Sequence, residues 1–597
     1  MPQPITRQAL HAQLEELIAD EDADALRALL HAMADECHPR ERTALLERIR
    51  RNRTNATDHP QASDLDGVIT ELQRALAIAK DEADRDPPHP DEEEDWLGPF
   101  ADVMPQVHDV LECIGSELTH GRAEVARSAY ERVWDLLDIE DGFGRGPALE
   151  AEDRSMAREH AARYLRSVYL ACPLETRIRA LAEAAERVRF VRGFSPLPRG
   201  RYVSLREIAE AGSDPLPEWT ETLTEVTSVF AEGADALGDF WLREATQASQ
   251  GLSGMEALAE RDGVVRPLAW LDAMGMAVNQ EQPERARGIW HRAEAVFAPG
   301  APVLADLADL AMGPFAQSAP ELLPRVRSAA FIADPSPERL LELWQALPTR
   351  EDRTTRLTEA AEHLASGRQG SPSDAASARP PVTDPRRLAF PPPGEFPETE
   401  PAALAFLFAG EWDRAAALVP ARERPGADAD RRTRPAVFVH ALTALSLAGR
   451  GHPGGAIQSL LTKTLAGGLP PLARHTHELP NGDPIGQRAR PDPATFAVRY
   501  VEAVQESLAD RPLSADERDV WMARCRQTAI EQCERVVTSK RRREYPQAAA
   551  AIAAVYEAAR ACGEQEDGED LVCQARSRHS GYPAFQRALR EALAETS

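Results

Sequence analysis

Apolar residues recur every three or four positions along most of this chain, the spacing that places them on one face of an α-helix. Before residue 84 the apolar stripes lie, in chain order, at residues 10–18, 26–33, 45–49 and 65–79. Residues 52–63 are polar, and residues 84–95 combine prolines with a run of like charges. We therefore expect an N-terminal helical segment at residues 1–83 and a solvated acidic linker at 84–95.

Paired helices are predicted from residue 96 to about residue 366. The three clearest apolar faces consist of Ala126, Ala129, Tyr130, Val133, Trp134 and Leu137, then Ala286, Ile289, Trp290, Ala293, Val296 and Phe297, then Leu340, Leu341, Trp344 and Leu347. Pro283 suits the first turn of the second helix, and Ser336 suits the N-cap of the third. Two short β-like segments, residues 201–205 and 264–270, are isolated and predict no sheet.

The clearest boundary in the chain is the segment 367–400, which is rich in proline, serine and alanine and cannot sustain a helix. A C-terminal helical-repeat domain is predicted over residues 401–597, with a proline- and glycine-rich loop at 467–493. Its helix near residue 515 begins with a capping box of Ser514 and Glu517. The apolar face of that helix consists of Trp521, Cys525, Ala529 and Val536.

Several predicted helix pairs share a turn with glycine or proline, followed by a helix that opens on alanine. These turns occupy residues 121–126, 282–286, 410–415 and 451–456. A small residue at the start of a helix lets two antiparallel helices approach closely, as in tetratricopeptide-like repeats. Since the spacing of the turns is irregular, the predicted fold is all-α: an irregular helical-repeat solenoid in two blocks, 96–366 and 401–597, joined by the proline-rich linker 367–400.

Composition narrows the classes of protein that the chain can belong to. Hydrophobic residues make up 43% of the chain but aromatic residues only 6%, which favours helices with small contacts over β-sandwiches. The formal net charge of −28 repels phosphate, so a nucleic-acid partner is expected only if the basic residues are segregated. Residues 1–22 show no signal peptide, and no run of 18 apolar residues occurs, so we expect a cytoplasmic protein with no membrane partner.

Near the C-terminus, residues 531–593 resemble the closing helices of bacterial SWIM zinc-finger family proteins. The usual pattern there is a basic Arg-Arg-x-Tyr step, an alanine-rich helix, and an Arg-His-x-x-x-Pro-Ala-Phe segment that leads into a last helix. The matching residues are Arg542, Arg543, Tyr545, Ala548, Ala549, Tyr556, Arg578, His579, Pro583, Phe585 and Leu589. The resemblance implies a helical scaffold, and a place among bacterial multi-gene and conflict-type systems.

The zinc finger of that family is missing from this chain. Four Cys or His ligands must close a tetrahedron around zinc, and the finger supplies them as Cys-x-Cys and Cys-x-His. The seven cysteines form neither pattern and no Cys-x-x-Cys pair. The resemblance therefore implies neither zinc nor nucleic-acid binding.

Two groups of residues have spacings that metal sites use. Glu117 and His120 are three apart, as in di-iron helical bundles, with Glu112 and His108 one and two turns earlier, but no second Glu-x-x-His exists. The other group, His475, His477 and Asp483, lies in the loop 467–493, where ligands are poorly held. We expect ordinary polar surface at both places, hence no metal and no cofactor.

The remaining candidates are thiols, basic clusters and glycine-rich loops. Cys525 and Cys533 lie two turns apart on one helix, and only Cys525 falls clearly on its apolar face; packing is expected rather than redox chemistry. The clusters at 48–53 and 540–543 are basic. They are either solvated helix ends or surfaces that contact RNA, an acidic partner or acidic segments of this chain. The glycine-rich loops at 142–146 and 449–455 follow no strand and lack the lysine of a phosphate-binding loop, so no catalytic residue is predicted.

These observations predict a non-enzymatic scaffold or adaptor that binds another protein along a concave helical surface. The alternative is a helical repeat that binds nucleic acid, and only that alternative predicts binding that weakens steeply with salt. The linker 367–400 is either a spacer or a regulated cleavage or docking site. Its residues 384–393, Asp-Pro-Arg-Arg-Leu-Ala-Phe-Pro-Pro-Pro, combine a basic pair, an apolar anchor and a stiff polyproline stretch that suit capture as an extended peptide.

Overall fold

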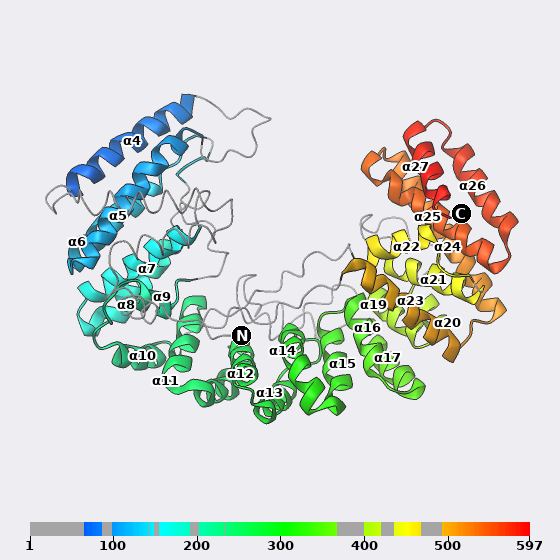
Figure 1. Ribbon diagram of the computed structural model, residues 1–597, viewed down its shortest axis with the longest axis horizontal. Coiled ribbons are helices and arrows are strands. Elements are labelled where there is room, and N and C mark those ends of the chain that lie inside the picture. Colours follow the sequence, from blue (N-terminus) through cyan, green and yellow to red (C-terminus); the bar gives the residue numbers. More distant parts are fainter. Residues whose placement is uncertain are drawn as a thin grey trace, which may run out of the picture. The chain divides into compact units, whose positions relative to one another are not determined.

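We analysed a computed structural model of the chain, in which every regular element of the described residues is a helix (Figure 1). The structure describes residues 65–85, 98–142, 144–147, 154–190, 202–232, 235–366, 399–419, 435–449, 451–466 and 492–596. No strand occurs in these ranges, which confirms the all-α prediction for them. The helices predicted at residues 10–49 and the segments 86–97 and 467–491 lie outside the described residues.

The chain divides into two compact units, residues 1–254 and 255–597. The first unit contains α4 (Leu65–Arg85), η2 (Gly98–Val103), α5 (Met104–Thr119), α6 (Ala123–Leu137), α7 (Arg154–Ala171), α8 (Leu174–Phe190), α9 (Leu205–Glu210), α10 (Trp219–Val229) and most of α11 (Ala236–Asp262). Within α11 the backbone leaves the helical region at Gly251, where φ is 63°. The unit boundary follows directly after this kink.

The second unit continues from the end of α11 to the C-terminus. Its helices are α12 (Pro267–Asn279), α13 (Pro283–Val296), α14 (Pro302–Ser318), η4 (Pro320–Leu322), α15 (Leu323–Ala333), α16 (Pro337–Ala346), α17 (Arg350–Ala365), α19 (Thr399–Phe408), α20 (Trp412–Leu418), α21 (Pro435–Ala448), α22 (Gly455–Leu461), η7 (Thr462–Ala466), α23 (Pro493–Asp510), α24 (Ala515–Thr538), η8 (Arg542–Glu544), α25 (Tyr545–Cys562), α26 (Gln565–Arg578) and α27 (Pro583–Ala594). Many consecutive helices pack on each other, among them α12 to α16, α17 to α20 and α24 to α26, and α12 with α14 and α25 with α27 also pack across the helix between them.

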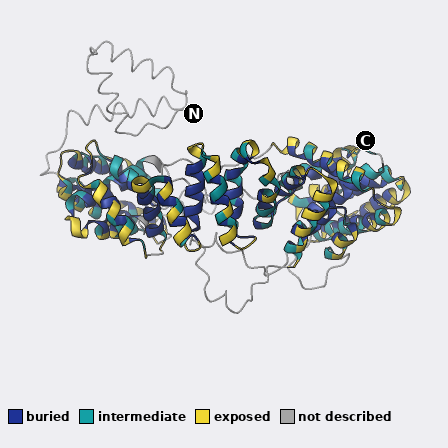
Figure 2. Cartoon of the chain, turned by 90° about the horizontal axis from the view of Figure 1, so that it is seen from below, coloured by how far each residue is buried: buried dark blue, intermediate teal, exposed yellow. Residues whose placement is uncertain are grey.

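The apolar faces predicted from the sequence are the buried faces of the helices. All six predicted residues of α6 are buried, as are the predicted residues on α16 and α24. Ser336 and Ser514 cap their helices as predicted, and Glu517 completes the box with Ser514. Figure 2 shows buried and exposed residues on opposite sides of individual helices. One predicted core residue, Val296, is instead 44% exposed, because it is the last residue of α13.

Neither β-like segment is part of a strand. Residues 202–204 lead into the capping box of α9, in which Ser204 accepts from the backbone N–H of Glu207. In the second segment Pro267 begins α12, and Trp270 is buried in that helix. The β-like composition was misleading here because a proline in the first turn and an N-cap decide the local conformation.

The turn between neighbouring helices recurs with the same geometry in both units. At Gly121, Gly410 and Gly563, φ lies between 77° and 83°, and the next N–H donates to a carbonyl five residues earlier, as in a Schellman turn. Glu281 and Lys540 adopt the same left-handed conformation without being glycine, with φ of 55°. Alanines 126, 286, 415 and 456, which follow the four predicted turns, are fully buried. The predicted close approach of helices after these turns is therefore present.

Helices on the two sides of segment 367–398 share one core. α17 ends at Ala365 and α19 begins at Thr399, and these two helices pack directly on each other. One cluster of buried residues runs from Phe331 and Trp344 through α19 to α27. The proline-rich segment therefore connects helices that belong to the same packing unit.

No helix among the described residues is long and apolar enough to cross a membrane.

Candidate functional site

A pocket lies between α21, α23 and α24 in the second unit, and local sequence signals set its walls. α23 begins with Asp492, whose carboxylate accepts from Thr495 N at 3.0 Å, and has Pro493 in its first turn. Pro512 cannot continue a helix, so α23 ends just before it, and α24 begins only a few residues later. Ser514 then starts α24 through its capping box. The two helices consequently meet at a tight corner that faces the end of α21.

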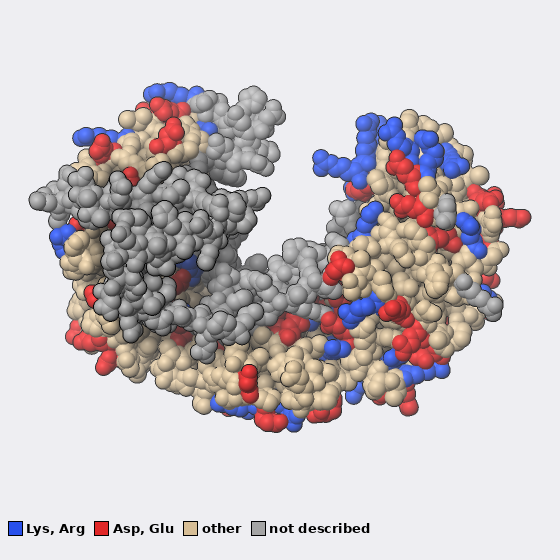
Figure 3. Space-filling view, in the orientation of Figure 1, with Lys and Arg blue, Asp and Glu red and all other residues tan. Residues whose placement is uncertain are grey.

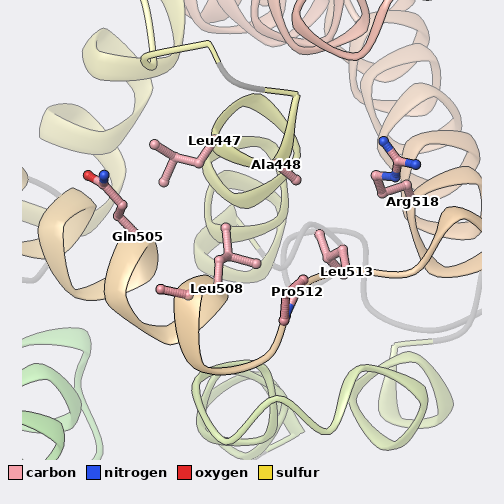
Figure 4. Close-up of a pocket in the computed structure, with 8 residues that line it drawn as sticks. Leu447, Ala448, Gln505, Leu508, Pro512, Leu513 and Arg518 are labelled. Carbon is pink, nitrogen blue, oxygen red and sulfur yellow. The ribbon is translucent and has the colours of Figure 1, made fainter.

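Apolar side chains form most of this pocket, which has a volume of about 260 Å³. The lining residues are Leu447, Ala448, Gln505, Leu508, Ala509, Pro512, Leu513 and Arg518. Figure 4 shows Gln505 and Arg518 on opposite sides of the apolar residues. Since a water molecule occupies about 30 Å³ in the liquid, the pocket has room for one large apolar side chain rather than for a single water. Leu447 and Leu508 also pack against the core, and these contacts restrict the movement of their side chains in the pocket wall.

Arg518 gives the pocket its one cationic group. The side chain is half-buried, and its Nε is buried without a hydrogen-bond partner. Among the described residues the guanidinium forms neither an ion pair nor a hydrogen bond, whereas the neighbouring Arg511 is paired with Glu517 at 3.1 Å. An arginine binds a carboxylate through two parallel hydrogen bonds. The pocket can therefore accept an apolar side chain together with a nearby carboxylate.

His108, Glu112 and Glu117 lie on α5, and His120 is its C-cap. The prediction of ordinary polar surface here is wrong for His108 and Glu117, which are buried because they face neighbouring helices, and these residues are divided among different partners. Arg122 pairs with both carboxylate oxygens of Glu117, and His120 Nδ1 lies 2.7 Å from Ser116 O on the surface. Glu112 faces α7, where Arg163 Nη1 donates to Glu112 Oε2 at 3.1 Å. No three His, Cys, Asp or Glu side chains in the described ranges are grouped so that they could hold a metal ion.

Glu112 belongs to a partly buried polar network between α5, α6 and α7. His160, which is 1% exposed, lies 3.5 Å from Glu112 Oε1 through Nε2 and 3.2 Å from Tyr130 Oη through Nδ1. The hydrogen bond to His160, and then the charge of Arg163, lower the pKa of Glu112 to about 2 against the opposing effect of burial. All the partners of this carboxylate come from the chain itself, so the network is structural.

Both thiols on α24 are buried packing residues. Burial raises the pKa of the Cys525 and Cys533 thiols to about 12. A thiol that stays protonated is a poor nucleophile and a poor metal ligand. This agrees with the packing role that the sequence predicted for them.

The glycine-rich loop at 449–455 receives a carboxylate of the same chain. Glu557 on α25 accepts from the backbone N–H groups of Gly454, Ala456 and Ile457, the last two at 3.2 and 3.4 Å, at the start of α22. A Cβ on Gly454 would lie 2.9 Å from this carboxylate, so glycine is needed there. The position that an anion such as phosphate would take at a helix N-terminus is thus occupied by Glu557.

A second internal carboxylate caps α9 in the first unit. Glu244 on α11 accepts from Leu205 N at 2.6 Å and Arg206 N at 2.8 Å. Burial raises the pKa of Glu244 to about 8, partly opposed by these two hydrogen bonds. Sequence reasoning missed Glu244 and Glu557, because carboxylates 39 and about 100 positions from the helix they cap carry no local signal.

Two of the other predicted candidates lie in the described residues, and the rest lie outside them. In the loop 142–146, Asp141 holds Arg145 through its main-chain N–H and its guanidinium, so the glycines there form a structural turn. The basic cluster 540–543 lies where α24 ends and η8 begins, and it is exposed. His475, His477, Asp483 and the cluster 48–53 lie outside the described residues.

The pocket was also missed, since its lining comes from three helices and a corner that are separated in sequence. The capping box at Ser514 and the proline before it were the available signals, because together they place a tight corner next to the end of α23. No family model, no curated protein and no solved structure matches this chain.

Proposed function

We propose that this protein is a non-enzymatic helical scaffold or adaptor that binds a segment of a partner protein in the pocket between α21, α23 and α24. The observation that carries the proposal is the unpaired guanidinium of Arg518 beside a set of exposed and half-buried apolar residues. An apolar anchor in a pocket with a charged group at its rim is the usual composition of a binding hot spot. The expected ligand is a peptide segment with a large apolar residue next to an acidic residue or a C-terminal carboxylate.

The fold that we propose for this scaffold is an irregular, tetratricopeptide-like solenoid. Three kinds of observation support it: repeated left-handed turns of the same geometry, buried alanines at the starts of helices, and contacts between a helix and the next but one. Each such helix pair buries its apolar face against its neighbours and leaves a surface for partners. The resemblance of residues 531–593 to SWIM zinc-finger family proteins supports the same kind of helical scaffold in a bacterial, cytoplasmic multi-gene system.

Peptide selection on the full-length chain tests the pocket. From a random peptide display library, the wild-type protein should enrich sequences that place a large apolar residue beside a carboxylate. Ala509→Trp should abolish the enrichment, because Ala509 is exposed and lines the pocket, so that an indole there fills the space without disturbing the core. Arg518→Gln should keep the apolar preference and remove the acidic one.

The matched control for Ala509→Trp is Val498→Trp. Val498 is 58% exposed on the same helix and does not line the pocket, so this variant adds an indole of the same size elsewhere on α23. If both tryptophan variants retain the wild-type peptides, or if both lose them, the pocket is not the binding site. Enrichment of peptides without an acidic group would refute the role assigned to Arg518.

We further propose that segment 367–400 is a spacer or a docking site rather than a point at which two halves come apart. The packing of α17 on α19 supports this, since cleavage between them leaves one shared core. Limited proteolysis should cut at residues 367–398, and the two fragments should then co-elute in size-exclusion chromatography under native conditions. Fragments that separate without denaturant would favour the regulated cleavage switch instead.

A nucleic-acid-binding repeat is the alternative function, and the formal net charge of −28 argues against it. The two proposals differ in their response to salt. Binding to phosphates should fall by orders of magnitude between about 50 and 200 mM salt, whereas an apolar pocket should be much less sensitive.

A further inference from the structure

Five helix ends meet at one place in the second unit. α24 ends there, η8 and α25 begin, α26 ends and α27 begins. Ring contacts fix this arrangement: Tyr545 at the start of α25 lies 6.0 Å from Phe585 on α27, and His579 after α26 lies 5.6 Å from Phe585. Gln586 also donates to the carbonyl oxygens of Arg576 and His579, both at 3.1 Å. Residues far apart in sequence are therefore neighbours at this end of the helices.

Exposed basic side chains are concentrated at this place, which we call the basic end. It is defined by Lys540, Arg541, Arg542, Arg543, Arg576, Arg578 and Arg587. Figure 3 shows lysine and arginine gathered over the ends of α24 to α27. Within the part of the chain that the structure describes, only Arg541 and Arg578 of this set form ion pairs, with Glu544 and Glu534. Five cations are therefore left available to a partner.

The concentration is unusual for this chain. Its formal net charge is −28, and most described arginines elsewhere are in ion pairs with neighbouring carboxylates. Unpaired like charges at one place repel one another, which lowers the stability of the folded chain. A surface of this kind is typical of a binding site for an anionic partner, whose charges remove the repulsion.

We propose that the basic end binds an acidic segment of a partner protein, rich in aspartate and glutamate. Arginine forks pair with carboxylates in a bidentate way, and six of the seven basic residues are arginine. Single-stranded nucleic acid is less well matched, because at this end the rings of Tyr545 and Phe585 are buried and that of Tyr582 is half-buried against the core, which leaves little aromatic face for base stacking. The acidic remainder of the chain also repels a long polyanion more than a short peptide.

The basic end is a second binding surface, separate from the pocket with Arg518. Arg518 lies in the first turn of α24, and Lys540 follows the last turn. At a rise of 1.5 Å per residue, about 30 Å of helix separates them. Variants of one surface therefore leave the groups of the other in place, and failure of one proposal is distinguishable from failure of the other.

The test measures binding of a fluorescein-labelled peptide of aspartate, glutamate and serine to the full-length chain by fluorescence anisotropy. Arg542→Glu/Arg543→Glu should weaken binding about tenfold or more, because attraction becomes repulsion at the contact. Arg576→Glu/Arg587→Glu should weaken it similarly, although these residues lie outside the linear basic cluster. The matched control, Arg350→Glu/Lys463→Glu, makes the same charge change at exposed residues on α17 and η7 and should leave the affinity within about twofold.

Three outcomes overturn the proposal. Binding that is absent in the wild type, or equally weakened in the control, shows that the basic end is no specific site. A single-stranded RNA of equal charge that binds more tightly than the peptide assigns the surface to nucleic acid instead. Loss in Arg542→Glu/Arg543→Glu with no change in Arg576→Glu/Arg587→Glu reduces the site to the linear cluster. Circular dichroism of each variant shows whether it is folded.

Discussion

Helices α5, α6 and α7 enclose ionisable side chains, whereas helices α20, α21, α24 and α25 enclose aromatic and small apolar ones. In the first region Glu112, His160 and Arg163 form one network with Tyr130. In the second, the ring of Trp412 lies 5.6 Å from the ring of Trp521, and α25 buries Ile552 between two groups of alanines, 548–551 and 553–554. The helices of the first region are 15 to 18 residues long, whereas those of the second range from 7 to 24 residues.

The difference shows that two all-helical regions of one chain can be held together by different kinds of contact. Apolar packing is largely independent of pH, while a buried network depends on the ionisation of each member. The second region contains a buried histidine too, but burial lowers the pKa of His440 to about 3, so it stays neutral at ordinary pH. The two regions should therefore respond differently to mutation and to pH. Hydrogen–deuterium exchange, which reports on each region separately, can measure both responses.

The largest effect is expected for Trp412→Ala. Trp412 is 2% exposed and touches Trp521 and His440, so its removal leaves a large cavity. The opening free energy of α20 and α24 should fall by about 4 kcal/mol. Val498→Ala, at a position 58% exposed on α23, should change it by less than about 0.5 kcal/mol. A small effect of Trp412→Ala would show that the second region is not held by its aromatic contacts.

Alkaline sensitivity is the next largest effect, and it should come from Glu244. Because burial raises its pKa from 4.5 to about 8, the folded state holds a proton that the unfolded state has lost. The contribution of this group to stability is therefore full below pH 4.5 and falls as pH rises to 8, by about 3 kcal/mol between pH 5 and 8. Glu244→Gln should remove this dependence in the exchange of α9 and α11.

Glu557 offers the matched comparison in the second unit. Burial also raises its pKa, but it accepts three backbone N–H bonds rather than two, which favour the ionised form. Glu557→Gln should change the pH profile of α22 in the same direction and by less. If Glu244→Gln and wild type show parallel profiles from pH 5 to 8, Glu244 is ionised in the fold.

Breaking the network in the first unit should have a moderate effect. Arg163→Met leaves Glu112 and Glu159 without their shared cation, which should cost about 2 kcal/mol because these groups are only partly buried. The lowered pKa of Glu112 adds an acid dependence: its contribution is present above pH 4.5 and is lost as pH falls towards 2. Adding Glu112→Gln to Arg163→Met should recover part of the loss. No recovery would mean that Arg163 acts through packing alone.

The smallest expected effect concerns the left-handed turns. Here one substitution should stabilise the protein, whereas the core substitutions above should destabilise it. Glu281 has a φ of 55°, which costs a non-glycine residue about 1 kcal/mol. Glu281→Gly should therefore stabilise the turn between α12 and α13 by up to about 1 kcal/mol. Gly121→Ala, at φ 77° with no atom near the added Cβ, should destabilise its turn by a similar amount. The two differences can be read from thermal unfolding of the purified variants.

The sequence by itself determined the helices, their buried faces and several of their ends. Spacing of three and four, caps at Ser336 and Ser514, and prolines in first turns are signals within a few residues of the structure that they specify. The same locality explains its failures. Val296 belonged to the apolar stripe, but the helix ended there, and the left-handed turn at Lys540 carried no glycine to indicate it.

Only the tertiary structure decided which polar groups meet. Glu244 and Glu557 cap helices that lie far from them in sequence, and Glu112 finds His160 and Arg163 on another helix. The pocket and the basic end likewise combine residues from three or more helices. Local periodicity fixes which side of a helix faces inward. Which side chain of another helix an inward-facing residue contacts depends on how the helices pack. The spacing of residues along the chain does not encode these contacts.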